Sequence, residues 1–208
     1  MKTFKTAIVA ATTLTALTLA TAPTAVALDA SAGIATSYLF RGAEMSGGSA
    51  AFSADVSGSN NGLTYGVWAS SGDAQTEYDL YLDYSGTAGD IGYSIGYVDY
   101  NYLDGAKSGV DTEADGYEAY EDFEEAYIGL SFGSASVTYY DKQDSDDTYL
   151  AVGYDLGAYS LTYGDAEVDG EESTHFDVSY AVNDSLSLTV SKPEDEDAIV
   201  VASYSLPF

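Results

Sequence analysis

The sequence predicts an all-β protein, an antiparallel transmembrane β-barrel of about 12 strands. Three observations predict this fold. Apolar and polar side chains alternate with a period of two from about residue 31 to the C-terminus, and no helical period competes with that pattern. The connections between the alternating segments are short and long in turn. The last segment, 198–208, keeps its alternation as far as the terminal Phe208.

The N-terminal segment has the features of an export signal. Lys2 and Lys5 give it a positive start, residues 7–19 form an apolar run diluted by threonines, and Ala25-Val26-Ala27 offers a small-residue cleavage site. The run is too short and too rich in threonine for a membrane-spanning helix. We therefore expect residues 1–27 to be a signal peptide and residues 28–208 to form one outer-membrane barrel domain.

Twelve candidate strands follow this segment. In residues 76–85, for example, Tyr78 and Leu80 share one face while Glu77 and Asp79 share the other. The expected strands lie at about 31–41, 49–57, 63–70, 76–85, 91–102, 122–132, 135–142, 147–155, 158–164, 173–181, 185–191 and 198–208.

The connections differ on the two sides of the predicted sheet. Tight joints rich in Gly, Asn and Asp, such as 59–62 and 86–90, follow the even-numbered strands. Longer and mostly acidic links follow the odd-numbered strands, and the longest is 103–121. Short turns at one rim and longer outer loops at the other are typical of a membrane barrel. An even number of strands also places both termini at the short-turn rim.

A soluble β-sandwich or barrel would show the same alternation, so it is the main alternative fold. So many strands with almost no other structure would be unusual for a soluble domain. Tyrosines also recur near strand ends, for example Tyr93, Tyr97, Tyr100 and Tyr102, as the interfacial aromatic girdles of a membrane barrel require. Both observations favour the membrane barrel.

The mature chain is strongly acidic. Without the signal it has four basic residues against all 34 acidic ones, which leaves a net charge of −30. Such a charge repels nucleic acid and anionic lipid headgroups, so neither is expected as a partner. The absence of cysteine excludes disulfides and thiolate metal sites. Two explanations of the acidity stay open: a solvated surface like that of salt-adapted proteins, and the attraction of cations.

Several segments carry a resemblance to a known family. Residues 37–42 read Ser-Tyr-Leu-Phe-Arg-Gly, residues 66–70 read Gly-Val-Trp-Ala-Ser, and an acidic strand, 77–81, and a glycine-tyrosine repeat, 91–97, follow. Together they resemble the TorF-type porin family of exported bacterial proteins, whose members carry a Tyr-x-x-Arg-Gly element near the mature N-terminus. The match covers about residues 31–102, and the acidic stretch 103–125 departs from it. The resemblance implies an outer-membrane barrel with a pore, and no established substrate.

Arg41 is the only arginine in the chain. Its parity on the expected strand 31–41 points it into the lumen, where a guanidinium needs a carboxylate partner. We expect Glu77, Asp79 or Asp83 to supply that partner. Two interpretations stay open. Arg41 is either part of a charged constriction that sets selectivity, or a staple that joins its strand to the neighbouring strands and helps to close the barrel. We favour the staple.

Acidic residues on the inward parity predict a negative lumen, because a charge that faces lipid is costly. Such a lumen favours cations and uncharged solutes over anions. The candidates are Glu77, Asp79, Asp83, Glu125 and Asp177, with Asp99 and Asp155 nearer the rims.

No residue pattern marks an enzyme or a metal protein. His175 shares its parity with Asp177, but no motif singles out a serine as a nucleophile, so we expect no catalytic residue. The acidic segments 144–147 and 165–172 do not match the calcium-loop pattern. We therefore expect no cofactor and no defined metal site.

The function we expect is that of an outer-membrane, porin-like channel for the passive diffusion of small cationic or neutral solutes. The alternative is a closed structural or surface-exposed barrel whose acidic loops attract ions and which transports nothing. In either case the expected partners are the lipid bilayer and the outer-membrane assembly machinery, since the terminal Phe208 resembles the C-terminal signature of outer-membrane barrels. The sequence indicates neither the solute nor the oligomeric state.

Overall fold

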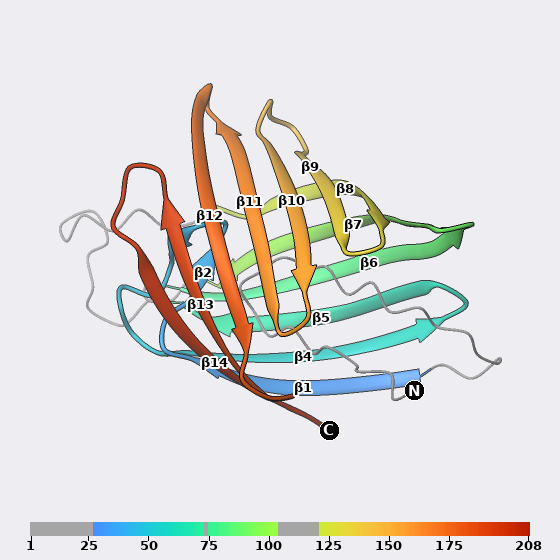
Figure 1. Cartoon of the computed structure of the whole chain (residues 1–208), viewed down its shortest axis with the longest axis horizontal. Coiled ribbons are helices and arrows are strands. Elements are labelled where there is room, and N and C mark those ends of the chain that lie inside the picture. The colour runs from blue at the N-terminus through green and yellow to red at the C-terminus, as the bar shows by residue number, and fades with distance from the viewer. Residues whose placement is uncertain (1–26, 73–74, 104–120) are drawn as a thin grey trace.

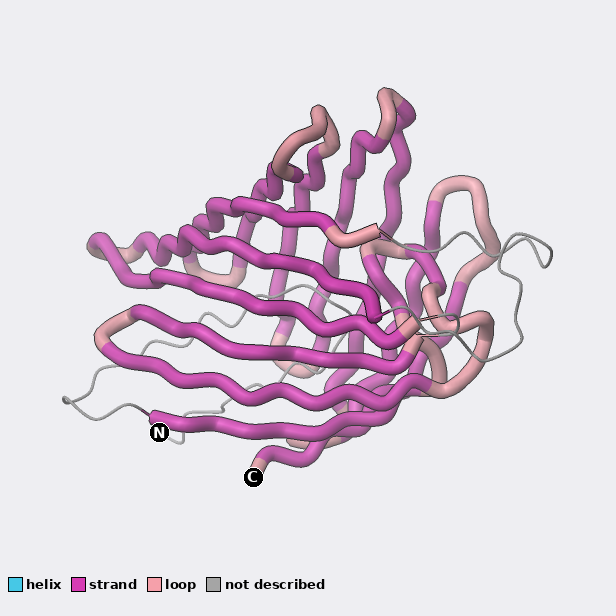
Figure 2. The backbone as a smooth tube through the Cα atoms, turned by 180° about the vertical axis from the view of Figure 1, so that it is seen from behind, coloured by secondary structure: helices cyan, strands magenta, loops and turns pink. Residues whose placement is uncertain are grey.

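The computed structural model describes residues 27–72, 75–103 and 121–208, and this part of the chain forms a closed antiparallel barrel with a small two-stranded hairpin (Figure 1). Within these ranges no helix is long and apolar enough to cross a membrane. The expected signal peptide and most of the expected loop 103–121 lie outside the described residues. The strands of the front wall, β10 to β12, run steeply across those of the rear wall, β4 to β6, as strongly tilted barrel strands do (Figures 1 and 2).

Every wall strand pairs with its neighbours in sequence, and the last strand pairs with the first. The predicted antiparallel barrel of 12 strands is therefore confirmed. The wall strands are β1 Ala27–Ala35, β4 Ala51–Asn60, β5 Leu63–Ser71, β6 Thr76–Ala88, β7 Ile91–Leu103, β8 Phe123–Phe132, β9 Ala135–Lys142, β10 Thr148–Leu156, β11 Tyr159–Val168, β12 Glu171–Ala181, β13 Leu186–Pro193 and β14 Ile199–Pro207. The hairpin strands are β2 Leu39–Phe40 and β3 Ala43–Glu44.

The seam between β1 and β14 closes the sheet. Gly33 lies opposite Ser205 in this pairing. The backbone N–H of Phe208 donates to the carbonyl of Ala30 at 2.8 Å, and the N–H of Thr36 donates to the carbonyl of Ala202 at 2.9 Å. Since both terminal strands are paired on both sides, the barrel presents no open sheet edge.

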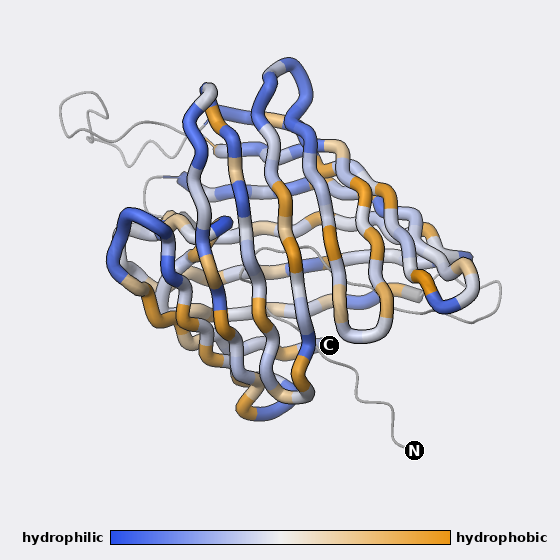
Figure 3. The backbone as a smooth tube through the Cα atoms, turned by 45° about the horizontal axis from the view of Figure 1, so that its top comes forward, coloured by the Kyte–Doolittle hydropathy of each residue, from blue (hydrophilic) through white to orange (hydrophobic). Residues whose placement is uncertain are grey.

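The two faces of the barrel have the reverse of the polarity of a soluble protein. On the outer face Phe52 is 62% exposed and Ile95 is 58% exposed, whereas the inward Glu77 and Asp79 are each 3% exposed. Figure 3 shows hydrophobic and hydrophilic positions alternating along the strands, and hydrophilic loops at the upper ends of the front hairpins. Other exposed apolar side chains are Val56, Leu63, Val67, Leu80, Leu82, Ile91, Ile128, Leu130, Val152, Leu188, Val190, Val200 and Leu206.

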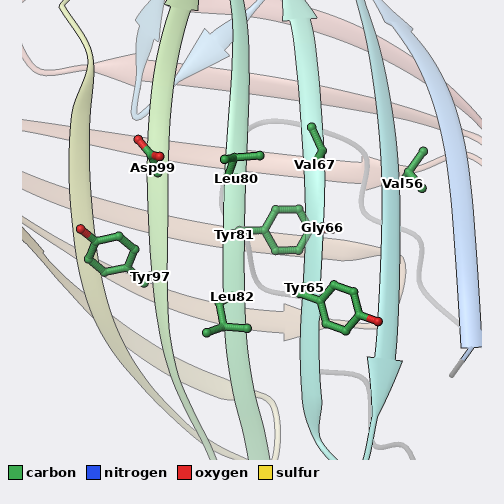
Figure 4. A pocket seen from close by; sticks show the side chains of 9 residues that line it. All are labelled: Val56, Tyr65, Gly66, Val67, Leu80, Tyr81, Leu82, Tyr97 and Asp99. Carbon is green, nitrogen blue, oxygen red and sulfur yellow. The ribbon is translucent and has the colours of Figure 1, made fainter.

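An apolar groove of about 420 Å³ crosses the outer face of β4 to β7 (Figure 4). Val67, Leu80 and Leu82 line it, and Asp99 lies at one end. The expectation that Asp99 faces inward is therefore wrong. Its neighbour Tyr100 is the inward residue, with an exposed fraction of 7%, and successive strand residues point to opposite faces.

The inward position of Tyr100 also corrects the expectation that all the tyrosines of this strand belong to an outer aromatic girdle. Tyr97 is exposed on the outer face, as a girdle residue must be, but Tyr100 packs inside the barrel against Phe40 and Phe123. Tyr102, two residues further along β7, also stacks on Phe123. The tyrosines of this protein thus serve both faces of the wall.

Inward tyrosines lie over glycines of the adjacent strand. Tyr81 is directly opposite Gly66, and Tyr127 is directly opposite Gly96. A Cβ at Gly66 would lie 2.4 Å from the Tyr81 ring, and one at Gly96 would lie 2.3 Å from the Tyr127 ring. Only glycine leaves room for a ring to lie flat on the wall at these points. The rings therefore occupy the lumen without pushing the strands apart.

Candidate functional site

Residues 37–46, between β1 and β4, turn into the barrel and form what we call the lumen hairpin. At its tip Arg41 has φ of +50° and Gly42 has φ of +86°. Two successive positive φ values are typical of the tight type I′ turn. Behind the tip, the N–H of Met45 donates to the carbonyl of Tyr38 at 2.7 Å. The expectation that residues 36–41 continue the first wall strand is therefore wrong.

The apolar residues of this segment are buried inside the barrel. Tyr38 and Leu39 are 5% and 1% exposed. On a wall strand, one of two consecutive residues would lie on the exposed outer face. Inside the barrel, both are instead covered by surrounding side chains, which removes their apolar surface from water.

Glu44 holds the return limb of the lumen hairpin. Its carboxylate accepts hydrogen bonds from the Ser37 hydroxyl, from the Ser46 N–H at 2.9 Å and hydroxyl at 2.6 Å, and from the Gly48 N–H at 2.9 Å. Burial raises the pKa of this carboxyl, but the hydrogen bonds to its charged form outweigh burial and leave the pKa lowered. Glu44 is thus an ionised anchor at neutral pH.

Arg41 binds Glu125 of β8 in a bidentate ion pair. Nη1 donates to Oε1 at 2.8 Å, and Nη2 donates to Oε2 at 2.5 Å. The side chains are 14% and 3% exposed, so water screens this pair little. The prediction that Glu77, Asp79 or Asp83 would be the partner is wrong, because the hairpin carries the guanidinium across the lumen to β8.

Three aromatic rings surround the same guanidinium, and we call them the aromatic cage. The Cζ atom of Arg41 lies 4.2 Å from the ring centroid of Tyr149, 4.8 Å from that of Tyr140 and 4.8 Å from that of Phe40. These distances are within the range of cation–π attraction. Sequence reasoning missed Tyr140 and Tyr149, although both have the inward parity and lie directly opposite each other on β9 and β10.

The hairpin tip packs against a row of hydrogen-bonded side chains on β10 and β12. The Tyr149 hydroxyl lies 2.9 Å from Nε2 of His175, and Nδ1 of His175 lies 3.0 Å from Oδ1 of Asp177. A Cβ at Gly42 would lie 2.6 Å from the His175 Cβ. This row orients the Tyr149 ring beneath Arg41, and all three of its residues are buried.

The remaining predicted lumen residues lie apart from Arg41. Glu77 and Asp79 of β6 form what we call the acid pair, close to Tyr38 at the base of the hairpin. Asp83, further along β6, accepts a hydrogen bond from the Tyr127 hydroxyl at 2.8 Å. The structure thus joins Arg41 to Glu125 and leaves the acid pair as a second group of charge.

Solved outer-membrane proteins share only a distant likeness with this barrel. A mutant of the Rh. blastica porin is 16% identical with a TM-score of 0.40, over 76% of this chain and 55% of that chain. Escherichia coli outer membrane phospholipase A is 11% identical with a TM-score of 0.47, over 85% and 91% of the two chains. Pseudomonas aeruginosa OprD is 14% identical with a TM-score of 0.39, over 87% of this chain and 67% of that chain. This chain therefore spans little more than half the length of the porin.

No curated protein sequence matches the chain. A family model does match, from residue 19 to residue 204. The match includes the whole lumen hairpin and all wall strands except the last residues of β14. The chain belongs to this family, the bacterial proteins of unknown function named Gcw_chp.

Proposed function

We propose that the protein is an outer-membrane channel for small cations and uncharged solutes, with the lumen hairpin at its constriction. The observation that carries this proposal is the inverted polarity of the closed barrel. An apolar outer face suits the hydrocarbon of a bilayer, and an interior rich in carboxylates favours cations. The expected export signal agrees with this location. The resemblance to TorF-type porins also agrees, since its Tyr-x-x-Arg-Gly element forms the hairpin tip.

The charge inside the barrel is not balanced by Arg41. Its guanidinium is neutralised by Glu125, while Asp83 accepts only from a tyrosine hydroxyl. Asp55 of β4 likewise accepts a hydrogen bond from the Tyr81 hydroxyl at 2.9 Å. These carboxylates give a permeating cation a favourable potential. The tyrosine rings and the hairpin narrow the path, so we expect a small unitary conductance.

A closed barrel with a structural role is the second candidate, and the packing of the lumen hairpin favours it. Gly42 lies against His175, and the Arg41 guanidinium lies among the rings of the aromatic cage. A hairpin docked this firmly could block the lumen permanently. The two candidates differ in one observable, which is whether the folded barrel conducts with the hairpin in place.

Planar-bilayer recording of refolded residues 28–208 tests the proposal. We expect small steps whose reversal potential in a salt gradient shows preference for cations. The substitution Asp83→Asn should weaken that preference, whereas Asp99→Asn, on the outer face, should leave it unchanged. A third protein should carry a flexible Gly-Ser segment of equal length in place of residues 38–46.

The outcomes separate the candidates. If the native barrel is silent and the hairpin replacement conducts, the structural role is supported and the channel proposal fails. If both are silent although folded, no path exists through the lumen. Recovery of the exported protein in the soluble periplasmic fraction would overturn the membrane location itself.

A further inference from the structure

We propose that the acid pair, with Tyr38 of the lumen hairpin, binds one divalent cation of the Ca²⁺ class inside the barrel. This inference rests on the proposed function in one respect, since the ion must reach the lumen. It assigns a defined ligand to residues that were expected to act only through a diffuse negative potential.

The first support is the geometry of the acid pair. Glu77 and Asp79 are separated by one residue on β6, so both side chains point inward. Each is 3% exposed, and the two carboxylates interact with each other. Oε1 of Glu77 and Oδ1 of Asp79 are buried and accept no hydrogen bond among the described residues. Two buried carboxylates with unsatisfied oxygens are unstable together unless a positive charge joins them.

The second support comes from a different segment of the chain. Tyr38 is 5% exposed, and its buried hydroxyl makes no hydrogen bond of ordinary geometry in the described part of the chain. The hydroxyl interacts with both carboxylates of the acid pair, and its contact with Glu77 has hydrogen-bond character. The Tyr38 ring lies 5.8 Å, centroid to centroid, from the ring of Trp68. The Tyr38 oxygen thus approaches the acid pair from the hairpin side.

The surrounding wall offers further oxygen. Ser70 of β5 lies directly opposite Glu77 and is 3% exposed. Its hydroxyl donates to the carbonyl of Ser71 at 3.5 Å, and its oxygen keeps the lone pairs that a cation would use. Carboxylate, phenol and hydroxyl oxygens are hard ligands, which suit Ca²⁺ better than zinc or copper. When both carboxyls are ionised, their two negative charges match a divalent ion.

No basic side chain in the described ranges neutralises the acid pair. Arg41 is paired with Glu125, and Lys142 is paired with Asp147 at 2.9 Å. Lys192 donates to the backbone carbonyl of Pro193, the last residue of β13, at 2.8 Å and to that of Glu194 in the following loop at 3.4 Å. Within the described part of the chain, the compensating charge is therefore left to a metal cation or to a proton shared between the carboxyls.

Terbium luminescence tests this site, because Tb³⁺ takes the same oxygen ligands as Ca²⁺ and is sensitised by nearby tryptophan. Trp68 is the only tryptophan in the sequence and lies directly opposite Asp79. We expect the refolded chain, residues 28–208, to show saturable sensitised emission at one Tb³⁺ per chain. Added Ca²⁺ should displace it, and the affinity should fall as the pH is lowered, since protons compete for the same oxygens.

Two variants and one control define the result. Glu77→Gln combined with Asp79→Asn should weaken binding at least about tenfold, as the loss of metal-site groups does. Tyr38→Phe should weaken it less. Asp195→Asn combined with Glu196→Gln, in the loop before β14, should leave it unchanged. If the acid-pair variant does not refold, as judged by heat-modifiable migration, the Tyr38→Phe variant decides.

Emission that persists in these variants, or a native chain without saturable emission, overturns the site. A proton shared by the two carboxyls is then the compensating charge. Bilayer recording of the same samples keeps the two proposals separate. Cation-selective steps without Tb³⁺ binding would remove the metal site alone, and Tb³⁺ binding to a silent barrel would remove the channel alone.

Discussion

Removing the Arg41 guanidinium tests whether the lumen hairpin is held by a specific ion pair. The substitution Arg41→Met keeps most of the apolar side chain and leaves Glu125 buried without a partner. Breaking a buried pair from one side costs about 3–5 kcal/mol. Contact with the aromatic cage adds about 0.5–2 kcal/mol per ring, although the three rings share one cation and their contributions overlap. We expect a total loss of about 4 kcal/mol.

A double-mutant cycle isolates the pair from the packing. Glu125→Leu alone leaves Arg41 buried and uncompensated, so we expect a loss of similar size. The double variant replaces a buried pair with apolar groups, which is often nearly neutral. The two single losses together, about 8 kcal/mol, should therefore exceed the double loss by several kcal/mol. Arg41→Lys should recover little, because an ammonium cannot make the bidentate contact seen with both carboxylate oxygens.

The assay is urea unfolding of the barrel refolded in detergent micelles, with equal denaturant slopes required for all variants. Undocking of the hairpin alone would limit the measured loss, because water would then reach Glu125. Limited proteolysis at residues 45–49 reports on that local event. If the single losses simply add, with a coupling below about 0.5 kcal/mol, the ion pair does not hold the hairpin and our reasoning is refuted.

Two further predictions concern the wall and the outer loops. Gly66→Ala places a Cβ 2.4 Å from the Tyr81 ring and should cost about 1–3 kcal/mol in the same unfolding assay, and an unchanged urea midpoint would show that the ring is free to move. Asp147 accepts from the N–H of Asp169 and from Lys142, which lowers its pKa below the ordinary 3.8. A depressed folded pKa contributes stability that is present above the unfolded pKa and is lost as the pH falls through the folded value. The protection factors of residues 143–147 against hydrogen exchange should therefore fall below about pH 4. Asp147→Asn should show low protection factors at every pH, and an identical acid response in that variant would rule out this carboxyl as the cause.

The wall was predictable because its rule is local. A period of two sets both the strand and the face, so Glu77, Asp79 and Asp83 could be placed inward from the sequence, while Leu80 and Leu82 face outward. The same rule failed at Asp99. There the strand presents tyrosines on both faces, and aromatic side chains fit a lipid interface as well as a packed lumen.

The partner of Arg41 was not predictable, because Glu125 lies 84 residues away and nothing in the periodicity joins them. A hairpin that enters the lumen has no period of its own. Gly42 and the two glycines after Ser46 mark turns, but turn residues do not say on which side of the wall a loop lies. The aromatic cage was missed for the same reason, since its rings come from three separate strands.

The sequence by itself determined the barrel, the order of its wall strands and the facing of most of their residues, because alternation acts between neighbours along the chain. Only the tertiary structure decided that residues 37–46 fill the lumen and that Arg41 is neutralised there. The position of this hairpin depends on the volume inside the barrel and on the carboxylate of Glu125 on the opposite wall. Both are properties of the closed barrel, and no single segment contains them.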